Sequence, residues 1–563
     1  MVGAVREVDL ARVPASQRNW ANDTLFYTHG FGFVAALGNT RDPDGRPSFV
    51  SSNIPPVGDL GEFQPRIYFG ESSPTYSIVG APEGAEALEL DFPADDAPGG
   101  QRTFIYDGSG GVDISTAWHR LLFSVKYQEA NILLTGRIND ESKILFDRDP
   151  KTRVEKVAPW LSLDGDPYPS VVDGKIVWIV DGYTTTNNYP YSDRTTLEST
   201  TATSLTTEQQ QIVAPRDQVN YIRNSVKATV DAYDGTVTLY EWDADDPVLK
   251  TWRKAFPNTV RDRAEIPPEL LEHLRYPQDL FKVQREKLTQ YHVTDPRAFY
   301  SEGDFWRIPA DPTQKTADLQ PPYYLTLQMP GQEERSFSLT STFVPAGNDR
   351  NNLVAFAAVN SDPGEDYGTI RVLQLPRSVQ INGPQQVQNN FSSDSRVAET
   401  VNVLRLGDSQ VRYGNLLTLP IGGGLLYVQP VYVQASAETG FPLLRKVLVS
   451  FGDKLAFEDT LDLALNSVFG GESGVGDTDE PDVVVPVDTP GGTPPVTPVP
   501  GEAPPPAPPP AETLSAALAD IQTAYRDGQA ALARSDFAAY GEAQGRLQAA
   551  IERAIAAEDA ATP

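Results

Sequence analysis

The sequence predicts an α+β fold: a β-rich, multi-lobe domain with interspersed helices, then a proline-rich linker and a C-terminal helical hairpin. Two pairs of β-branched runs turn at Asp-Gly dipeptides, which is typical of β-hairpins. The 48 prolines and 43 glycines indicate many turns and an extended tract. At 563 residues the chain exceeds the about 250 to 300 residues of a single core, so we expect more than one lobe.

The two hairpins are the clearest local signals. Ser170–Val172 and Lys175–Val180 are β-branched runs on either side of Asp173-Gly174, a pair that supplies the positive φ angles of a tight turn. Asn220–Trp242 repeats the pattern around Asp234-Gly235. We expect both hairpins to share one antiparallel sheet.

Composition and pattern divide the chain into five parts. They are a polar linker at 1–15, a first α+β lobe at 16–310, a second β-rich lobe at 311–472, a disordered acidic and proline-rich linker at 473–511, and a helical hairpin at 512–560. The second linker cannot bury a core, because it lacks apolar periodicity and is rich in Gly, Pro and acidic residues. The hairpin has apolar residues at helical spacing and exposes an apolar face for docking.

The first lobe mixes strands and helices. A strand is predicted at 24–36, in which His29 is interpreted as structural rather than as a ligand. Ser115 precedes apolar residues at helical spacing as far as Leu134, so the pattern predicts a capped amphipathic helix in the core. Residues 194–215 are rich in Thr and Gln without periodicity, and we expect a mobile lid or a disordered excursion there. Further helices are predicted at 247–256, 267–275 and 277–292.

The second lobe reads as a series of short strands with turns between them. Strands are predicted at 323–328, 336–343, 354–359, 369–375, 416–419, 424–433 and 446–451, and helices at 384–406 and 460–469. The glycines at 422–424 could cradle an anion. No Gly-Lys-Ser/Thr signature follows them, so a hairpin turn is favoured.

Charge and cysteine content exclude several classes of function. The 76 acidic and 46 basic residues give a net charge of −30, which repels phosphate backbones and anionic lipid headgroups, so no nucleic-acid partner is expected. The absence of cysteine excludes disulfides, thiolate catalysis and sulfur-ligated metals. No run of about 18 apolar residues is present, and we expect the chain as given to be soluble.

A group of aspartates suggests a metal site. Asp164, Asp166 and Asp181 lie close together in the sequence, and calcium prefers several carboxylate and carbonyl oxygens. The alternative is that these aspartates only form turns, because Asp164 and Asp181 are each followed by glycine. In addition, no calcium-loop pattern with a terminal Glu is present. No cofactor is expected apart from calcium at these residues.

The segment that follows suggests a ligand site. Its aromatic and amide side chains are Tyr183, Asn187, Asn188, Tyr189 and Tyr191. Tyrosine faces beside amide donors and acceptors are typical of surfaces that bind sugars and peptides. The alternative is a long polar crossover loop packed by its own tyrosines.

Several motifs together identify a resemblance. They are Asn19-Trp20, Tyr27–Gly30, Pro65–Gly70, Trp160–Tyr191, Asn220–Lys227, Leu274–Pro277 and Leu425–Pro430. With these motifs the chain resembles uncharacterised protein family 0182, a family of large bacterial multi-pass membrane proteins. The resemblance implies a block of transmembrane helices followed by one large domain outside the membrane, to which this chain would correspond. It implies no activity and no catalytic residue.

We consider three functions as expectations, of which the first and the third rest on this resemblance. The first is a domain on the extracytoplasmic face of the bacterial cell membrane that binds or scaffolds an envelope component, with its own N-terminal transmembrane region as a partner. The second is a hydrolase of envelope glycans or peptides that uses carboxylates, because the chain has only four histidines. The third is an accessory outer domain of a transporter. No catalytic motif is present, so no enzymatic activity is assigned.

Overall fold

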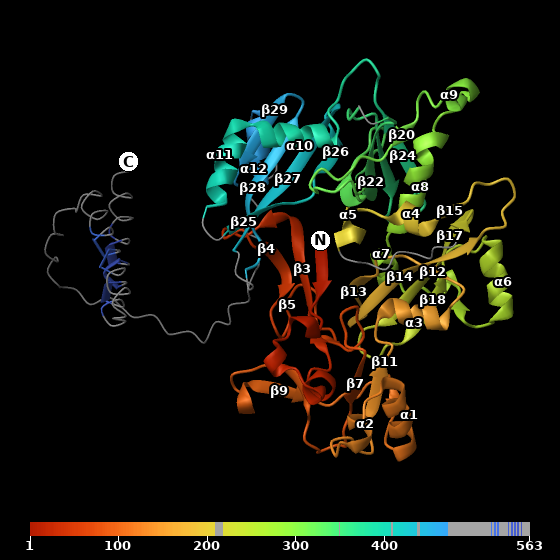
Figure 1. The fold of residues 1–563 in the computed structure, drawn as a ribbon, viewed down its shortest axis with the longest axis vertical. Helices are drawn as coiled ribbons and strands as arrows, with labels where there is room; N and C mark the ends of the chain where they lie inside the picture. The colour runs from red at the N-terminus through yellow and green to blue at the C-terminus, as the bar shows by residue number, and fades with distance from the viewer. Residues whose placement is uncertain are drawn as a thin grey trace, which may run out of the picture. The chain divides into compact units, whose positions relative to one another are not determined.

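The computed structural model describes residues 1–208, 218–347, 350–406, 409–435 and 440–470, together with single positions between 520 and 553. By their internal contacts the residues form two units, Met1–Val483 and Val484–Pro563. Figure 1 shows the first unit as a set of small sheets with helices on their faces. This mixture of strands and helices confirms the predicted β-rich α+β class.

A six-stranded sheet lies at the centre of the first unit, in the order β12-β14-β17-β18-β19 with β13 also paired to β14. Its strands are β12 (Ser162–Leu163), β13 (Tyr168–Val172), β14 (Lys175–Thr186), β17 (Tyr221–Asp231), β18 (Val237–Glu241) and β19 (Val260–Arg261). β14 is buried along most of its length, because apolar side chains pack on both of its faces.

Both predicted hairpins are confirmed. Asp173 and Gly174 have φ angles of 48° and 70°, so the dipeptide makes the tight turn between β13 and β14. β17 and β18 form the second hairpin, in which Gly235 has a φ angle of 73°. β14 pairs with β17 antiparallel, so the two hairpins share one sheet, as the sequence predicts.

The N-terminal residues are folded into a second sheet. Val2–Val5 form strand β1, which pairs with β3 (Phe33–Arg41), and β3 pairs in turn with β4 (Pro47–Ser52). The interpretation of residues 1–15 as a linker is therefore wrong for this stretch, because the short apolar run completes a sheet edge. The predicted strand at 24–36 is also partly wrong, because Asn22–Phe26 form a π-helix.

The other strands before residue 220 form one further small sheet and three two-stranded pairs, and one of them joins the sheet of β1. The sheet is β10-β11-β7, and the pairs are β2 with β6, β8 with β9 and β15 with β16, while β5 completes the sheet of β1, β3 and β4. Their bounds are β2 (Gly30–Phe31), β5 (Val57–Gly58), β6 (Arg66–Ile67), β7 (Tyr76–Val79), β8 (Glu89–Pro93), β9 (Gln101–Phe104), β10 (Val112–Asp113), β11 (Lys143–Phe146), β15 (Thr195–Thr196) and β16 (Gln218–Val219).

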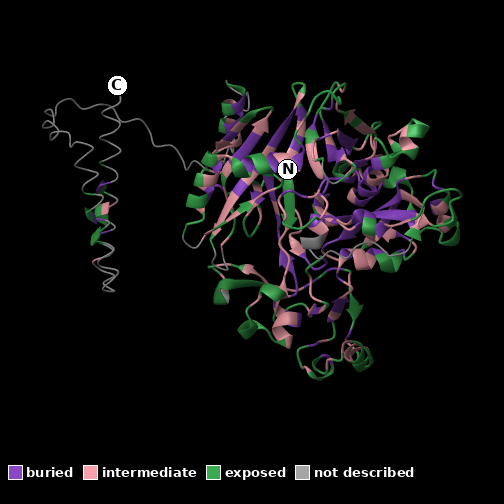
Figure 2. Ribbon diagram, turned by 45° about the horizontal axis from the view of Figure 1, so that its top comes forward, coloured by how far each residue is buried: buried purple, intermediate pink, exposed green. Residues whose placement is uncertain are grey.

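The helix predicted from Ser115 to Leu134 is two helices, α1 (Ala117–Tyr127) and α2 (Asn131–Leu134). Thr116 caps α1, and the helix ends at Gln128, whose φ of 53° is left-handed. The predicted core position is wrong, because α1 contains no buried residue. Figure 2 accordingly shows green and pink, not purple, on the helix at the lower end of this unit.

Two five-stranded sheets lie in the later described part of the first unit, and they confirm the strands predicted after residue 311. The first contains β20 (Trp306–Arg307), β21 (Tyr323–Leu327), β22 (Ser336–Pro345), β23 (Ala355–Asn360) and β24 (Ile370–Gln374). The second contains β25 (Ser409–Tyr413), β26 (Leu417–Ile421), β27 (Gly424–Ala435), β28 (Leu443–Phe451) and β29 (Lys454–Glu458). Gly422 and Gly423 have positive φ angles and form the turn between β26 and β27.

The other helices are α3 (Pro150–Val157), α4 (Leu197–Thr201), α5 (Ser204–Glu208), α6 (Pro247–Ala255), α7 (Pro268–His273), α8 (Gln278–Tyr291), α9 (Pro296–Tyr300), α10 (Pro384–Ser393), α11 (Ser395–Leu404) and α12 (Leu461–Phe469). A disordered excursion at 194–215 is wrong for residues 195–208, which form β15, α4 and α5 with Leu197, Thr201 and Ser204 buried, and Thr201 of α4 donates a hydrogen bond to the Leu197 carbonyl. The alternative of a mobile lid stays a prediction. Residues 209–217 lie outside the described ranges.

One hydrophobic core crosses the predicted lobe boundary at 310/311. It joins Tyr183 and Phe281 from the first predicted lobe to Leu339, Phe343 and Val359 from the second. The two predicted lobes therefore share packing, in agreement with the assignment of Met1–Val483 to one unit.

The described C-terminal positions are helical. Ion pairs connect Asp520 with Arg553 and Asp527 with Arg546, a spacing that requires two antiparallel segments. The predicted linker at 473–511 lies outside the described residues. None of the helices in the described ranges combines the length and apolar character that crossing a membrane requires.

Asp246 offers a test of how the central sheet is joined to α6. Its buried carboxylate caps the helix through the Val248 and Leu249 amides and also accepts hydrogen bonds from three hydroxyl groups of the sheet, those of Thr184, Tyr221 and Ser225. Asp246→Ala should lower the free energy of unfolding by about 3 kcal/mol, because a cap is lost and buried donors lose their acceptor.

Denaturant unfolding of the variants measures this loss. Asp394→Ala is the matched control, because Asp394 caps α11 through two amides but is only half-buried. We expect a loss of about 1 kcal/mol for the control. Equal losses for the two variants would contradict the role of Asp246 in joining sheet and helix.

Candidate functional site

The loop that connects β14 to β15 forms an open hollow at the surface. Its volume is about 570 Å³, and its lining residues are Asn188, Tyr189, Pro190, Tyr191, Ser192, Asp193, Arg194 and Asn220. Three of the five residues predicted to bind a ligand thus line one hollow, and Asn187 lies beside them in the same exposed loop.

Aromatic surface is available in this hollow. Tyr191 is fully exposed and Tyr189 is 55% exposed, and the Tyr189 ring stacks on that of Tyr221 with 6.0 Å between the ring centroids. Tyr191 has a φ of 55°, a left-handed conformation that is uncommon for a bulky residue. Strained conformations of this kind cluster at binding sites, where the surrounding structure maintains them.

Asn220 holds the loop in place. Its side-chain amide donates to the carbonyl oxygens of Tyr189 and Ser192 at 2.8 and 3.3 Å, and its Oδ1 accepts from the Tyr189 amide at 3.0 Å. Because Asn220 precedes the long buried strand β17, these bonds attach the loop to the central sheet. The two tyrosines are therefore presented by a braced loop.

Tyr183, the fifth predicted ligand residue, does not belong to this hollow. It is buried, and its hydroxyl group donates to Asp164 Oδ2 at 2.5 Å. The difference follows from position in the chain: Tyr183 lies within β14 and packs in the core shared with α8 and the β20 to β24 sheet, whereas residues 187–191 follow the end of the strand at Thr186.

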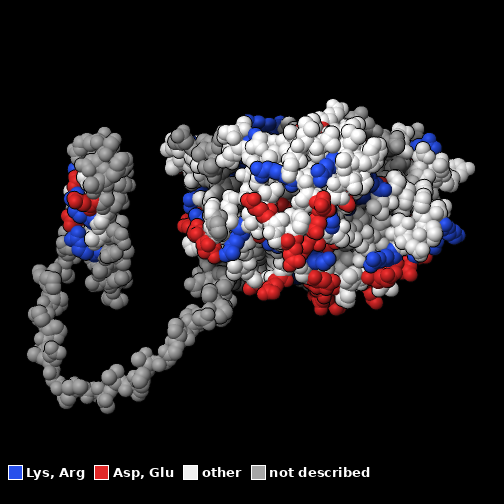
Figure 3. Space-filling view, turned by 90° about the horizontal axis from the view of Figure 1, so that it is seen from below, with Lys and Arg blue, Asp and Glu red and all other residues white. Residues whose placement is uncertain are grey.

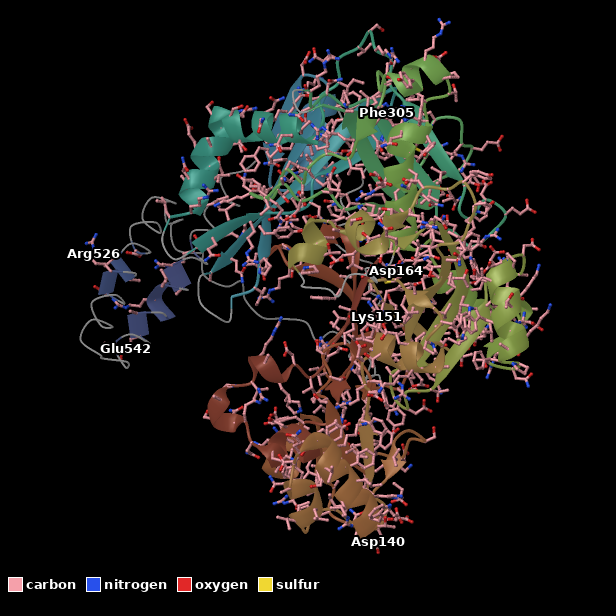
Figure 4. All side chains as sticks on the ribbon, turned by 45° about the vertical axis from the view of Figure 1, so that its right-hand side comes forward. Asp140, Lys151, Asp164, Phe305, Arg526 and Glu542 are labelled. Atoms are coloured by element: carbon pink, nitrogen blue, oxygen red, sulfur yellow. The ribbon has the colours of Figure 1, made fainter. Side chains whose placement is uncertain are left out.

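The predicted metal ligands lie in an ionic cluster in which Asp164 and Asp181 are buried and Asp166 is half-buried. Asp181 Oδ1 pairs with Lys227 Nζ at 2.5 Å, and Arg275 pairs with Asp166 at 2.9 Å. Asp164 accepts from Tyr183 and from the backbone amides of Asp166 and Asp279. Figure 4 marks Asp164 in the interior of the unit.

Two members of this cluster were missed in the sequence. Asp279 and Lys282 lie one helical turn apart on α8, both buried, and their side chains are 2.9 Å apart. Asp279 also accepts a hydrogen bond from the Gly165 amide, which ties α8 to the segment that carries Asp164. The available signal was the Asp-x-x-Lys spacing on a predicted helix, which places two opposite charges one helical turn apart.

Burial dominates the electrostatics of the cluster. It raises the pKa of Asp279 to about 6, and the nearby Asp164 carboxylate adds to this effect while Lys282 opposes it. Burial also raises the pKa of Asp166 and of Asp181 and lowers the pKa of Lys227, although the ion pair of Lys227 with Asp181 works in the opposite direction for both partners.

Among the residues that the structure describes, no three His, Asp or Glu side chains form a group that could hold a metal ion. The carboxylates of Asp164, Asp166 and Asp181 instead receive hydrogen bonds or ion pairs from protein groups. Calcium binding gains no support from this geometry and stays a prediction from sequence.

A second cavity of about 330 Å³ is lined by residues of β7, β8 and β9 and of the loops beside them. Glu86, Glu89, Arg137 and Asn139 are among its lining residues. Glu89 is buried, and its oxygens accept hydrogen bonds from two hydroxyl groups and two backbone amides, those of Thr28, Tyr68, Gly80 and Tyr106. His29 is buried nearby with Nε2 3.2 Å from Asp91 Oδ1, a contact that suits the predicted structural role.

The raised pKa of Asp279 predicts a pH dependence. The folded protein binds this proton more tightly than the unfolded chain, so the stabilising contribution is fully present below pH about 4 and is lost as pH rises through about 6. Over that window, the free energy of unfolding of the wild type should fall by about 2 to 3 kcal/mol relative to Asp279→Asn.

Denaturant unfolding of both proteins at several pH values measures this difference. Asp279→Asn removes the ion pair with Lys282, which shifts its free energy of unfolding by a constant amount relative to the wild type. The titration of Asp279 in the wild type makes this difference change with pH. A separation that stays constant from pH 4 to 7 would contradict the proton linkage.

The comparisons with known proteins agree on one family. The model of the Uncharacterised protein family (UPF0182) matches residues 1–404. No solved structure is significantly similar to the chain.

The curated relatives are UPF0182 proteins of bacteria. The relative from Streptomyces coelicolor is 53% identical over 558 residues, which are 98% of this chain and 52% of that protein. The relative from Kineococcus radiotolerans is 52% identical over an alignment of 576 positions, gaps included, that covers 99% of this chain and 56% of that protein. The chain spans about half the length of the curated relatives it matches. With a family match over most of its length and relatives of this identity, the chain belongs to the Uncharacterised protein family UPF0182.

Proposed function

We propose that this chain acts on the extracytoplasmic face of a bacterial cell membrane as a binding domain, and that the loop of residues 187–194 binds carbohydrate of the envelope. The observation that carries the proposal is the braced hollow in which Tyr189, Tyr191 and Asn188 are exposed together. The position at the membrane rests on the family resemblance.

The chemistry of the hollow supports a sugar ligand. A pyranose ring offers C–H groups for stacking on an aromatic face and hydroxyl groups for amide and guanidinium donors. The exposed ring of Tyr191 supplies the face, while Asn188 and Arg194 supply donors at the same surface. Because Asn220 already fixes the loop, binding would order few additional side chains, which lowers its entropic cost.

An anionic polymer fits the hollow less well than a neutral sugar. Asp193 lines the hollow, and its carboxylate pairs with Lys287 at 3.5 Å, so part of the local positive charge is already neutralised. The chain as a whole carries a net charge of −30. Neutral or weakly charged glycans are therefore the preferred ligand class.

Hydrolysis is the second candidate function, favoured by the two carboxylates in the cavity of about 330 Å³. Glycoside hydrolysis requires one carboxyl group that gives a proton and a second one that activates water or attacks the sugar. The Glu89 oxygens are occupied by four protein donors, so only Glu86 of this pair is free to meet a substrate. Binding without turnover is therefore the leading proposal.

The binding proposal predicts the effect of removing one ring. Tyr191→Ala should weaken the binding of neutral, soluble fragments of envelope glycan about tenfold, because the loss of one stacked sugar corresponds to about 1.4 kcal/mol. Titration calorimetry measures the affinity, and release of new reducing ends in the same samples would favour hydrolysis.

Tyr300→Ala is the matched control, because Tyr300 is 91% exposed on α9 and does not line the hollow. The control should bind as tightly as the wild type. If the wild type binds no fragment, or if both variants lose affinity equally, the carbohydrate proposal fails.

A further inference from the structure

A row of three charged side chains crosses the central sheet. Asp181 of β14 lies directly opposite Lys227 of β17. On the other side of β14, the Asp164 amide donates to the Asp181 carbonyl oxygen at 2.9 Å, so Asp164 continues the pairing of β12 with β14. Side chains directly opposite each other on antiparallel strands point to the same face of the sheet. The row therefore places two carboxylates and one amine on one face.

This row is shielded from water. Lys227, Asp181 and Asp164 are all buried, whereas Figure 3 shows many other charged side chains, in blue and red, at the surface. The rings of Trp242 and Tyr367 lie 5.2 and 5.6 Å from Lys227 Nζ, measured to the ring centroids. A covalent bond formed among these groups would therefore be protected from hydrolysis.

The amine is held against the carboxyl group. Lys227 Nζ lies 2.5 Å from Asp181 Oδ1. It also donates to the Arg275 carbonyl oxygen at 2.9 Å and to the Tyr367 hydroxyl at 3.1 Å, which fixes its direction. Asn224 Nδ2 donates to Asp181 Oδ1 at 3.0 Å, where it would stabilise negative charge on that oxygen during an attack on Cγ. Two groups held in contact in this way react far faster than the same groups free in solution.

Burial also favours the uncharged forms of both groups. It raises the pKa of Asp181 and lowers the pKa of Lys227, because each charge loses its hydration. When one proton moves from the nitrogen to the oxygen, the ion pair becomes a free amine beside a carboxylic acid. These are the two forms that condense to an amide.

We propose that Lys227 and Asp181 condense within the folded chain to an isopeptide bond that joins β17 to β14. The Nζ lone pair attacks Asp181 Cγ, the bond between Cγ and the acid hydroxyl breaks, and one water molecule leaves. The proton that the nitrogen gives up passes to the departing hydroxyl group, a transfer that we assign to Asp164, the next carboxylate in the row. The amine and the acid supply every atom of the amide and of the water. This modification goes beyond the proposed carbohydrate loop and does not depend on it.

Intact mass spectrometry of the whole denatured chain tests the bond. The wild type should be lighter than its sequence by one water molecule, and a peptide map should contain a branched peptide that joins residues 181 and 227. Lys227→Met and Asp181→Ala should each have the full mass of their own sequences. Lys175→Met is the control, because Lys175 pairs with Asp231 at 2.9 Å across the same two strands but has a side chain that is 57% exposed. It should lose one water molecule, as the wild type does.

The wild-type mass decides the question even where a variant fails to fold. A wild type with its full sequence mass overturns the proposal. So does a missing water that maps to a succinimide at an Asp-Gly pair such as Asp181-Gly182, since that ring forms within one strand and leaves Lys227 free. If Asp164→Asn still forms the bond, the role of Asp164 in the proton transfer is wrong.

Discussion

The buried ion pair between Lys227 and Asp181 is the constraint on which the first unit depends. Lys227 is completely buried on β17, and its ammonium group reaches Asp181 on β14, the Arg275 carbonyl oxygen at 2.9 Å and the Tyr367 hydroxyl at 3.1 Å. Those three partners come from the central sheet, the segment after α7 and the connection between β23 and β24. Because a buried ammonium needs several oxygen partners, the position of each segment is fixed by the same atom.

The other charged groups extend this arrangement toward α8. The Asp164 carboxylate accepts a hydrogen bond from the Asp279 amide, and the Asp279 carboxylate accepts one from the Gly165 amide. These two reciprocal bonds attach the segment before β13 to the start of α8. The core around Phe281 then connects α8 to the β20 to β24 sheet. The central sheet leads to the proposed carbohydrate loop, because β14 ends at Thr186, directly before this loop, and β17 begins beside Asn220. A rigid interior thus presents an exposed loop with little freedom.

What could be predicted from the sequence was local. The turn at Asp173-Gly174 follows from the φ angles of two adjacent residues, and the exposed tyrosines follow from a polar segment directly after a strand. The partners of Asp181 could not be predicted, because Lys227 and Tyr367 are distant in sequence and meet only after three segments pack. For the same reason an aspartate cluster suggested calcium, although lysine and arginine side chains lie beside it. Helix α1 shows a different limit. The apolar periodicity of its residues predicts a helix correctly, but periodicity alone does not say whether the apolar face packs against a core or stays exposed.

A double-mutant cycle on Lys227 and Asp181 tests the account most directly. Lys227→Met and Asp181→Asn should each lower the free energy of unfolding by about 3 to 5 kcal/mol, because each leaves a buried partner uncompensated. The double variant should lose no more than either single variant, since it leaves no buried charge alone. Losses of about 1 kcal/mol that simply add in the double variant would show that the pair does not hold the segments together.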